Sequence, residues 1–511
     1  MDRRVRVRFA PSPTGALHIG GVRTALYNYL FAKKNNGDFL IRIEDTDQGR
    51  FVPGAEEYII ESLKWLGINA NEGIGFGDGP YAPYRQSERK PMYKAYVMQL
   101  LEAGHAYYAF DTLEDLEGMR ERLKASNVDA KYDAITRTTM KNSLTMPEDE
   151  VTRRLENGDA FVIRFKLPRK EEVKFHDEIR GWLSFNTSQM DDKVLFKSDG
   201  MPTYHLANVV DDYLMKISHV IRGEEWLPSA PLHVLLYRCL GWEDVMPVFV
   251  HLPLLLKPEG NGKLSKRDGD RLGFPVFPLK WVDPNTQETS VGYRDSGYLP
   301  EAVVNLLAML GWNPGTNQEI FSMAELIEKF TLERVSKSGA KFDQNKARWY
   351  NQQYIHKMDD TDLLPSLHTA LQTNCPELHF DDQYLLKVCH LVKEKITFNK
   401  EIWDYGQYFF IDPKNYDEGV IKKRWNEKIP ALLNDLVQLF SALPAFDHPN
   451  IETAYEVALN KNGITGKDFL QLFRVCLTGV AGGPPLFEIA ELLGKQITIN
   501  RIKLASEKIS I

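Results

Sequence analysis

The sequence has few cysteines and no long apolar run. Its 511 residues include only four cysteines, which are far apart and form no Cys-X-X-Cys pair: Cys239, Cys375, Cys389 and Cys476. This spacing argues against a disulfide framework and against a cysteine-based zinc site. No apolar stretch is long enough to cross a bilayer, and the residues after Met1 do not resemble a signal peptide. We therefore expect a cytoplasmic protein that does not contact a membrane.

An excess of positive charge is also missing. The net charge is −7, so any contact with a polyanion has to come from local basic patches. The hydrophobic content of 43% and the charged content of 26% are ordinary for a globular protein. A chain of this length suggests about two to four domains. Composition alone therefore does not point to a nucleic-acid ligand.

The first part of the chain has the pattern of a strand, a turn, a helix and a second strand. Apolar residues alternate with arginines over 4–9, and a segment with two prolines and a glycine at 11–15 ends this strand. Apolar residues then recur at helical spacing over 22–30, and alternation returns at 39–43. This order is a βαβ unit, which is typical of the start of a parallel α/β sheet.

Later changes in the pattern predict further domains. Strand signals return at 216–222 and 248–252, whereas helical apolar stripes dominate after residue 345. The intervening charged region, with a strand-like segment at 161–167, is expected to be an insertion in the sheet. The predicted domains are a discontinuous Rossmann-like catalytic domain (1–105 and 191–265), an inserted α+β domain (106–190), a further domain (266–345) and an all-α C-terminal module (346–511).

Residues 10–21 lie where the first predicted strand hands over to the first helix. Ligands in open α/β sheets bind outside the carboxyl ends of the strands, and a helix N-terminus attracts phosphate. Gly20 and Gly21 have no side chain, so a base such as adenine can lie close to the backbone, and His18 can donate a hydrogen bond to phosphate. A lone histidine is more often structural, but this position favours a nucleotide site.

A second basic segment lies far downstream, at residues 262–268. Lys263, Lys266 and Arg267 lie within five residues, next to flexible glycines. This composition suits a mobile loop that closes over a triphosphate, although a solvated basic loop is the alternative for such a run by itself. The pairing with the histidine segment favours the triphosphate interpretation.

Together these two segments carry a family resemblance. His18-Ile19-Gly20-Gly21 and Lys263-Leu264-Ser265-Lys266-Arg267 resemble the two signature motifs of class I aminoacyl-tRNA synthetases. The surrounding sequence is similar to the bacterial-type glutamyl-tRNA synthetases, in five blocks that occur in the right order: 8–15, 42–47, 84–89, 204–212 and 220–226. The second half matches more loosely, mainly at 297–302, 342–343 and 348–349. The resemblance implies a glutamate–tRNA ligase.

L-Glutamate has one ammonium and two carboxylates, so its site needs two cationic groups and one carboxylate. Arg8 and Arg222, each at the end of a predicted strand, suit the carboxylates because guanidinium binds both oxygens at once. Glu44, also at a strand end, suits the ammonium. Tyr204 and Asn208 are four residues apart and share a helical face. An ordinary ion pair is the alternative for each charged residue, and the sequence leaves open which arginine takes which carboxylate.

The resemblance adds residues and roles to this site. It implies that Ala10 and Ser12 line the glutamate pocket, and that Arg222 selects glutamate because glutaminyl relatives typically lack this arginine. An unpartnered buried charge would discriminate against glutamine by roughly a hundredfold or more. The predicted catalytic residues are His18, Lys263, Lys266 and Arg267, and the predicted ATP-binding residues are His18, Gly20, Gly21, Ser265 and Lys266.

The expected first step is attack of the glutamate α-carboxylate on the α-phosphorus of ATP, which Mg²⁺ accompanies. The carboxylate is already ionised, so the step needs positioning and charge stabilisation but no general base. The resulting adenylate then acylates the terminal ribose of the tRNA. The resemblance also implies that tRNA has to be bound before the adenylate forms.

The resemblance also assigns the other domains. The 106–190 insertion holds the tRNA acceptor end, 266–345 supports the stem, and 346–511 reads the anticodon of tRNA-Glu; no anticodon residue is assigned, and the charging of tRNA-Gln stays open. Some relatives carry zinc in the acceptor domain, but 107–110 offers no cysteine, so no zinc and no resident metal are predicted. The segment around 268–296 is longer than usual and is expected to be a loop or hairpin beside the active site. The expected oligomeric state is a monomer.

Four alternative functions fit the sequence less well. A glutaminyl-tRNA synthetase conflicts with Arg222 and with the helical C-terminal module. A shortened paralogue that glutamylates a tRNA base lacks an anticodon module, whereas this chain continues well past residue 345. An RNA-binding regulator without catalysis is disfavoured by the intact His18 and Lys266. A small-molecule adenylyltransferase would not need the C-terminal half.

Overall fold

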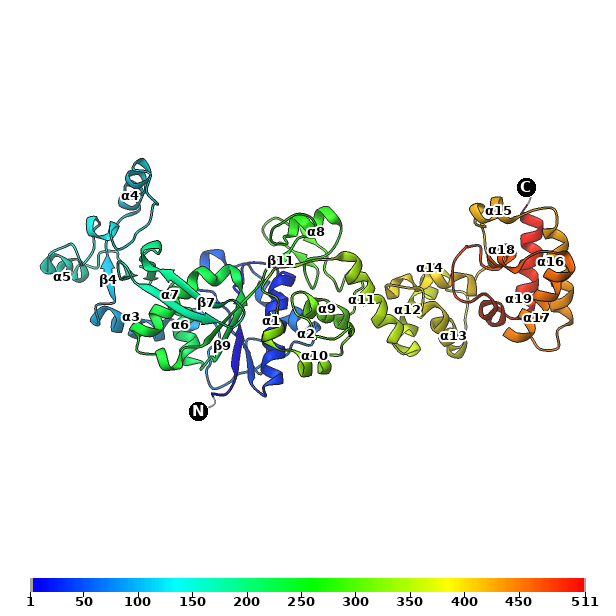
Figure 1. Cartoon of the computed structure of the whole chain (residues 1–511), viewed down its shortest axis with the longest axis horizontal. Coiled ribbons are helices and arrows are strands. Elements are labelled where there is room, and N and C mark those ends of the chain that lie inside the picture. Colours follow the sequence, from blue (N-terminus) through cyan, green and yellow to red (C-terminus); the bar gives the residue numbers. More distant parts are fainter. Residues whose placement is uncertain (1–2, 510–511) are drawn as a thin grey trace. The chain divides into compact units, whose positions relative to one another are not determined.

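The computed structural model describes residues 3–509, which divide into two compact units, residues up to 344 and residues from 345 on (Figure 1). Within the first unit, three strands form a parallel sheet in the order β1-β2-β3, and four more form a sheet in the order β7-β6-β10-β9. The strands are β1 (Arg6–Phe9), β2 (Asp38–Ile41), β3 (Glu72–Gly73), β6 (Glu172–Asp177), β7 (Gly181–Asn186), β9 (His219–Gly223) and β10 (Val248–Leu252).

These two sheets meet where β1 lies beside β9. The backbone N–H of Ser218 donates to the carbonyl of Arg6 at 2.8 Å, and the backbone N–H of Arg6 donates to the Ser218 hydroxyl at the same distance. Strands β6 and β9 both run parallel to β10, whereas β7 is antiparallel to β6. The predicted βαβ start and the parallel sheet are therefore present.

Helices pack against the buried strands of these two sheets. All four residues of β1 are buried, including Arg6 and Arg8, so the predicted arginine face of this strand points into the protein and not to solvent. Helix α1 packs against β1, β2 and β9. The helices of this region are α1 (Ile19–Lys34), α2 (Ala55–Trp65), α3 (Lys90–Glu102), α6 (Tyr204–Leu214) and α7 (Ala230–Cys239).

The insertion has its own three-stranded antiparallel sheet in the order β4-β5-β8. Its elements are β4 (Ala106–Ala109), α4 (Leu113–Ala125), α5 (Glu148–Glu156), β5 (Val162–Phe165) and β8 (Val194–Phe196). The β6–β7 hairpin, although expected within the insertion, pairs with β10 of the catalytic sheet, and β8 comes from beyond the expected boundary. Alternating residues indicate a strand but do not identify its hydrogen-bonding partner.

The rest of the first unit surrounds the basic signature segment. Its elements are β11 (Leu255–Leu256), α8 (Lys266–Leu272), β12 (Trp281–Val282), β13 (Thr289–Ser290), α9 (Pro300–Met309), α10 (Met323–Lys329) and β14 (Ala340–Lys341). The long 268–296 segment, which was expected to be a loop or a hairpin, contains the antiparallel β12–β13 hairpin. Lys263 precedes α8 and Lys266 is its first residue, so the signature segment is not an open loop over its whole length.

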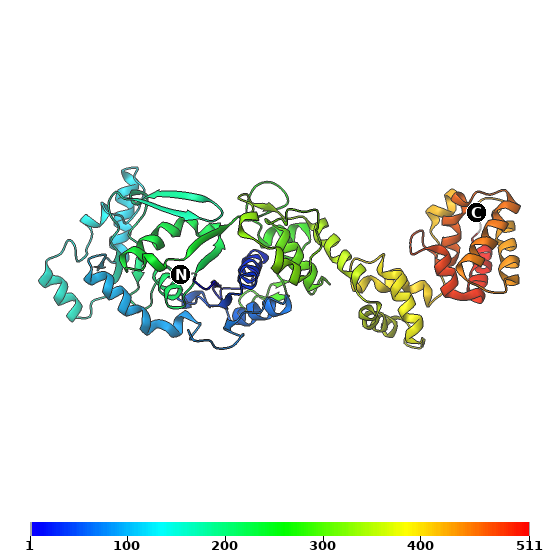
Figure 2. The same ribbon diagram turned by 60° about the horizontal axis from the view of Figure 1, so that its bottom comes forward.

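The second unit is helical, with no strand among residues 345–509. Figure 2 shows its helices in two groups, α12–α14 and α15–α19. The apolar stripes predicted from leucine and phenylalanine on α16 and α18 belong to the hydrophobic core of the second group. The helices are α11 (Gln344–Lys357), α12 (Asp360–Asn374), α13 (Asp382–Lys393), α14 (Ile402–Gly406), α15 (Glu418–Arg424), α16 (Ile429–Ala442), α17 (His448–Asn462), α18 (Gly466–Thr478) and α19 (Leu486–Lys508). Across residues 3–509, no helix combines the length and the apolar character that a bilayer span requires.

Candidate active site

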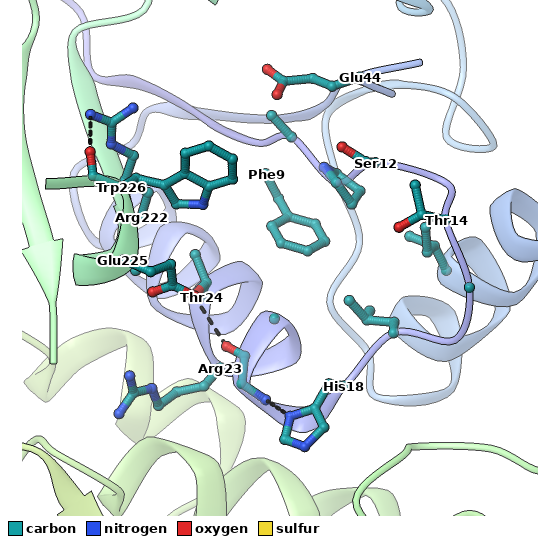
Figure 3. A pocket seen from close by; sticks show the side chains of 18 of the residues that line it. Phe9, Ser12, Thr14, His18, Arg23, Thr24, Glu44, Arg222, Glu225 and Trp226 are labelled. Atoms are coloured by element: carbon teal, nitrogen blue, oxygen red, sulfur yellow. Dashed lines mark hydrogen bonds between the residues drawn. The ribbon is translucent and has the colours of Figure 1, made fainter. Parts of the chain in front are cut away.

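A cavity of about 630 Å³ lies where β1 and β9 end and α1 begins (Figure 3). This is the edge of a parallel sheet at which ligands bind, and the volume lies within the usual range of about 300–1,000 Å³ for ligand pockets. Most of the predicted residues line it: Arg8, Ala10, Ser12, His18, Gly20, Gly21, Glu44, Tyr204, Asn208, Arg222 and Lys263. Three predicted residues do not line it, namely Ser265, Lys266 and Arg267.

His18 presents a hydrogen-bond donor to one side of this cavity. It precedes the first residue of α1, and its Nδ1 accepts the backbone N–H of Gly20 at 3.1 Å. Burial, with a smaller contribution from Lys263, lowers the pKa of His18 to about 4, so the ring is neutral near pH 7. A neutral imidazole whose Nδ1 accepts must carry its proton on Nε2. That Nε2 is buried and has no partner among the described residues, so it is an available donor for a ligand oxygen.

The two glycines that follow have different reasons to be glycine. A Cβ at Gly20 would meet only the His18 ring, at 3.5 Å, so this backbone position faces free space beside the cavity. A Cβ at Gly21 would lie 2.7 Å from the side chain of Leu17, which is closer than atoms approach without a shift. Gly20 therefore leaves room for a ligand, whereas a side chain at Gly21 would require the Leu17 side chain to shift.

The opposite side of the cavity holds a buried charge network. Arg8 donates to both carboxylate oxygens of Asp212, from Nε at 2.9 Å and from Nη2 at 3.1 Å. Arg42 bridges Asp212 and Glu44 at 2.8 and 3.0 Å, and Asn208 Nδ2 donates to Glu44 at 3.2 Å. Arg42 and Asp212 were not among the predicted site residues. They share family-like blocks with Glu44 and Asn208, but only the fold brings the two blocks together.

Burial and the arginines act in opposite directions on these carboxylates. Burial tends to raise the pKa of Asp212, but the neighbouring Arg8 and Arg42 outweigh it and hold this pKa below its ordinary value. For Glu44, burial dominates over the attraction of Arg42 and Arg8, and its pKa is raised. Asp212 thus neutralises the nearby arginine charge, whereas Glu44 would be stabilised as a carboxylate by an ammonium group in the cavity.

Arg222 extends its guanidinium along the same side of the cavity. Its Nε donates to His251 Nε2 at 3.0 Å, Nη1 to the Tyr204 hydroxyl at 2.8 Å, and Nη2 to the carbonyl of Trp226 at 3.3 Å. Of the five N–H groups of an arginine, these bonds leave two, one on each terminal nitrogen. Two such N–H groups match the two oxygens of a carboxylate. In Figure 3, Arg222 and Glu44 lie away from His18, with Phe9 between them.

The basic signature segment is held by acidic partners. Lys263 Nζ contacts Glu225 at 2.7 Å, and Lys266 Nζ contacts Glu288 of the β12–β13 connection at 2.6 Å. Both pairs are substantially exposed to solvent, as is Arg267. The hydroxyl and the backbone N–H of Ser265 both donate to Asp268 at the start of α8, at 2.6 and 3.0 Å, and its predicted role in ATP binding stays a prediction. Of the predicted signature-segment residues, only Lys263 therefore faces the cavity directly.

A metal site is not evident near these residues. No group of three or more histidine, cysteine, aspartate or glutamate side chains suited to a metal ion occurs in the part of the chain that the structure describes. The four cysteines are free and three of them are buried. The expectation that the protein holds no zinc stays a prediction.

The comparison with known proteins covers the whole chain. Residues 4–349 match the family described as tRNA synthetases class I (E and Q), catalytic domain, and residues 362–506 match the anticodon binding domain. A glutamate–tRNA ligase of Cytophaga hutchinsonii is 56% identical, with 100% of this chain and 99% of the relative covered. A glutamate–tRNA ligase of Amoebophilus asiaticus is 54% identical, with 99% and 98% covered.

Solved structures agree with these sequence matches. The crystal structure of a glutamate tRNA ligase from Elizabethkingia meningosepticum, in complex with its amino acid, has a TM-score of 0.92 and 49% identity, with 99% of this chain and 100% of that chain covered. That of a glutamate-tRNA synthetase from Elizabethkingia anophelis has a TM-score of 0.90 and 50% identity, with the same shares covered. These likenesses and the parallel sheet with its helical C-terminal module confirm the predicted fold class, family and enzyme activity. The chain belongs to the glutamate–tRNA ligases of the class I aminoacyl-tRNA synthetase family.

Proposed function

We propose that this enzyme joins L-glutamate to the 3′-terminal adenosine of tRNA-Glu in two steps that share the cavity described above. ATP with Mg²⁺ and L-glutamate first form glutamyl-adenylate and pyrophosphate, and the glutamyl group then passes to the tRNA. The observation that carries this proposal is the placement of Arg222 and Glu44 on one side of a single cavity and of the His18 Nε2 donor on the other.

The charged residues at one end of the cavity match the charged groups of L-glutamate, and this end is called the glutamate end. Glu44 binds the substrate ammonium, because Arg42 and Asn208 both donate to its Oε1 and leave Oε2 for the ligand, and because burial raises its pKa. Arg222 binds the side-chain carboxylate through the two N–H groups that its protein contacts leave, and the Tyr204 hydroxyl supports it. Arg8 uses Nε and Nη2 for Asp212, so it contributes to the substrate through Nη1. Asn208, Ala10 and Ser12 line the remaining wall.

The other end of the cavity, around His18, offers hydrogen-bond donors and cations that suit phosphate, and it is called the ATP end. The His18 Nε2–H and the positive end of the α1 dipole bind phosphate oxygens, and Gly20 leaves room for the nucleotide. Lys263, Lys266 and Arg267 stabilise charge on the departing pyrophosphate. Lys263 and Lys266 must exchange Glu225 and Glu288 for phosphate, which is feasible because exposed ion pairs contribute only about 0–1 kcal/mol.

The chemical step needs no base. The α-carboxylate attacks the α-phosphorus, a P–O bond forms, and the bond to the bridging oxygen breaks with its electron pair leaving on pyrophosphate. Pre-positioned donors near the phosphates act in a partly dry site, where charge stabilisation is strong. The second step transfers the glutamyl group from AMP to a ribose hydroxyl, whose proton leaves with the phosphate group.

The tRNA is assigned to the other domains by the same family membership. We assign the acceptor end to the inserted domain with the β4-β5-β8 sheet, the stem to 266–345 and the anticodon to the helical unit that matches the anticodon binding domain. The cytoplasm, where tRNA and ATP occur together, is the proposed place of action, and a monomer stays the predicted state.

ATP–pyrophosphate exchange tests the proposal. Exchange is measured with L-glutamate or L-glutamine, each with and without tRNA-Glu. We expect exchange with glutamate and tRNA, and little with glutamine. Exchange with glutamine in place of glutamate contradicts the assigned substrate, and no exchange under any condition contradicts catalysis and favours an RNA-binding role.

A further inference from the structure

Behind the glutamate end of the cavity, three adjacent strands place three buried polar side chains in a row. In the parallel pairing of β10 with β9, His251 is the register partner of Arg222, so their side chains emerge side by side. Strand β6 pairs with the other edge of β10 and ends at Asp177. His251 and Asp177 are both fully buried, and Arg222 is 5% exposed.

His251 is bonded on both ring nitrogens. Its Nδ1 lies 2.7 Å from Asp177 Oδ2, and its Nε2 lies 3.0 Å from Arg222 Nε. An arginine Nε–H can only donate, so Nε2 must be an acceptor and the proton must be on Nδ1, facing the carboxylate. Burial, only partly offset by Asp177, lowers the pKa of His251, which agrees with a neutral ring. The tautomer of His251 is therefore determined by its two neighbours.

Asp177 is held as firmly as the histidine. Its Oδ1 accepts the backbone N–H groups of Ile179 and Arg180 at 3.0 and 2.9 Å, and its Oδ2 also accepts the backbone N–H of His251 at 3.1 Å. Burial alone would raise the pKa of Asp177, but the hydrogen bonds from His251, Arg180 and Ile179 bring it below its ordinary value. A fixed carboxylate keeps the imidazole oriented, as second partners of functional histidines do elsewhere.

We propose that His251, locked in one tautomer by Asp177, is a positioning residue that orients the Arg222 guanidinium toward the side-chain carboxylate of the substrate. This inference rests on the proposed role of Arg222. The imidazole accepts from Nε, the Tyr204 hydroxyl from Nη1 and the Trp226 carbonyl from Nη2, so three bonds hold the Arg222 guanidinium in place. One N–H on each terminal nitrogen is then left for the substrate carboxylate. Selectivity for glutamate over glutamine then depends on a residue that does not touch the substrate.

Two substitutions of His251 separate a positioning role from a merely structural one. The amide nitrogen of asparagine can occupy the place of Nδ1 and keep the bond to Asp177, whereas the carbonyl of glutamine can occupy the place of Nε2 and keep an acceptor for Arg222. We expect His251→Gln to stay within about threefold of the natural enzyme in KM for glutamate. We expect His251→Asn to raise the KM for glutamate by roughly 10- to 100-fold, because the buried Nε–H of Arg222 then loses its acceptor.

The measurement is tRNA-dependent ATP–pyrophosphate exchange with separate KM values for glutamate and ATP. The KM for ATP is expected to stay within about twofold in both variants, since the ATP end is not touched. His219→Gln, on the same strand as Arg222 but bonded to Ser218, is the matched control and is expected to leave both KM values unchanged. Equal effects of the asparagine and glutamine variants on glutamate, or equal loss for glutamate and ATP, would overturn the positioning role.

Two further measurements distinguish a failure of the proposed Arg222 role from a failure of the His251 role. Arg222→Gln serves as the reference: if it leaves the KM for glutamate unchanged, the proposed role of Arg222 fails, whereas a large effect there with none in either His251 variant defeats only the positioning role. Should both His251 variants fail to fold, ¹⁵N spectra of the full natural chain labelled at histidine decide the matter. A His251 ring with its proton on Nδ1 and none on Nε2 supports the inference, and a protonated His251 Nε2 overturns it.

Discussion

The two ends of the cavity differ in how their charges are held. At the proposed glutamate end, Arg8, Arg42 and Asp212 are buried, and both arginines donate to Asp212 at 2.8–3.1 Å. At the proposed ATP end, Lys263 lines the cavity and Lys266 lies outside its lining; both are partly exposed, and each pairs with one acidic side chain. Buried charges must keep their partners, whereas exposed pairs exchange easily. We infer that the amino acid enters a site already built, while the lysines rearrange around the nucleotide.

The largest expected effect comes from removing a buried partner. Asp212→Asn leaves Arg8 and Arg42 without their shared carboxylate, and we expect the free energy of unfolding to fall by about 3–5 kcal/mol. Denaturant unfolding of the full chain measures it. Asp191→Asn, whose carboxylate pairs with Lys193 at the surface, is the control and should change stability by less than about 1 kcal/mol. Equal losses in the two variants would contradict the contrast between buried and exposed charges.

The next effect concerns the ATP end and should appear in rate and not in stability. His18→Asn keeps a good residue at the start of α1 but loses the Nε2–H donor, and we expect kcat for exchange to fall by about 100-fold or more. His18→Gln can return an N–H to that place and should retain more activity. Lys266→Ala should lower kcat to a similar extent. If His18→Asn turned over as fast as the natural enzyme, the assigned donor role would be wrong.

A smaller effect is expected in the pH dependence of stability. The pKa of His18 in the folded protein is about 4, below the ordinary value of 6.5, so the unfolded chain binds the extra proton between these values. The contribution of neutral His18 is therefore complete above about pH 6.5 and is lost as the pH falls towards 4. We expect unfolding curves of His18→Gln to be less sensitive to pH in this window than those of the natural chain. Identical pH dependence would show that His18 is not held neutral by burial.

The smallest effect is expected at the exposed hairpin contact. Glu288→Gln removes the carboxylate that holds Lys266, and stability should change by no more than about 1 kcal/mol. Because Lys266 no longer has to leave an ion pair, the KM for ATP should fall, by about threefold at most. A rise in that KM would show that Glu288 positions the lysine for the nucleotide instead of competing with it.

Much of the fold could be predicted from local patterns. Alternation over 4–9 and 39–43 identified the first two strands, and apolar stripes identified α1, α16 and α18. These patterns record which face of an element is buried, which is a local property. The membership of the β6–β7 hairpin in the catalytic sheet could not be predicted, because its pairing with β10 joins Asp177 to Phe249, far along the chain.

The site shows the same division. Charge and motif position predicted that Arg8, Glu44 and Arg222 would meet, and all three line one cavity. Asp212 lies within the family-like block 204–212, but the sequence does not predict its place in the site, because nothing local shows that it neutralises Arg8. Lys266 does not line the cavity and pairs with Glu288, which belongs to a segment to which the sequence assigned no role.

The sequence by itself determined which chemical groups are available: two arginines for two carboxylates, a histidine and glycines at a helix start, and a lysine-rich segment downstream. Only the tertiary structure decided how those groups are oriented and neutralised. Orientation depends on bonds such as that between His251 and Arg222, which join strands distant in sequence. Such bonds follow from strand order and register, because a buried polar group must find its partner wherever the fold brings one within about 3 Å.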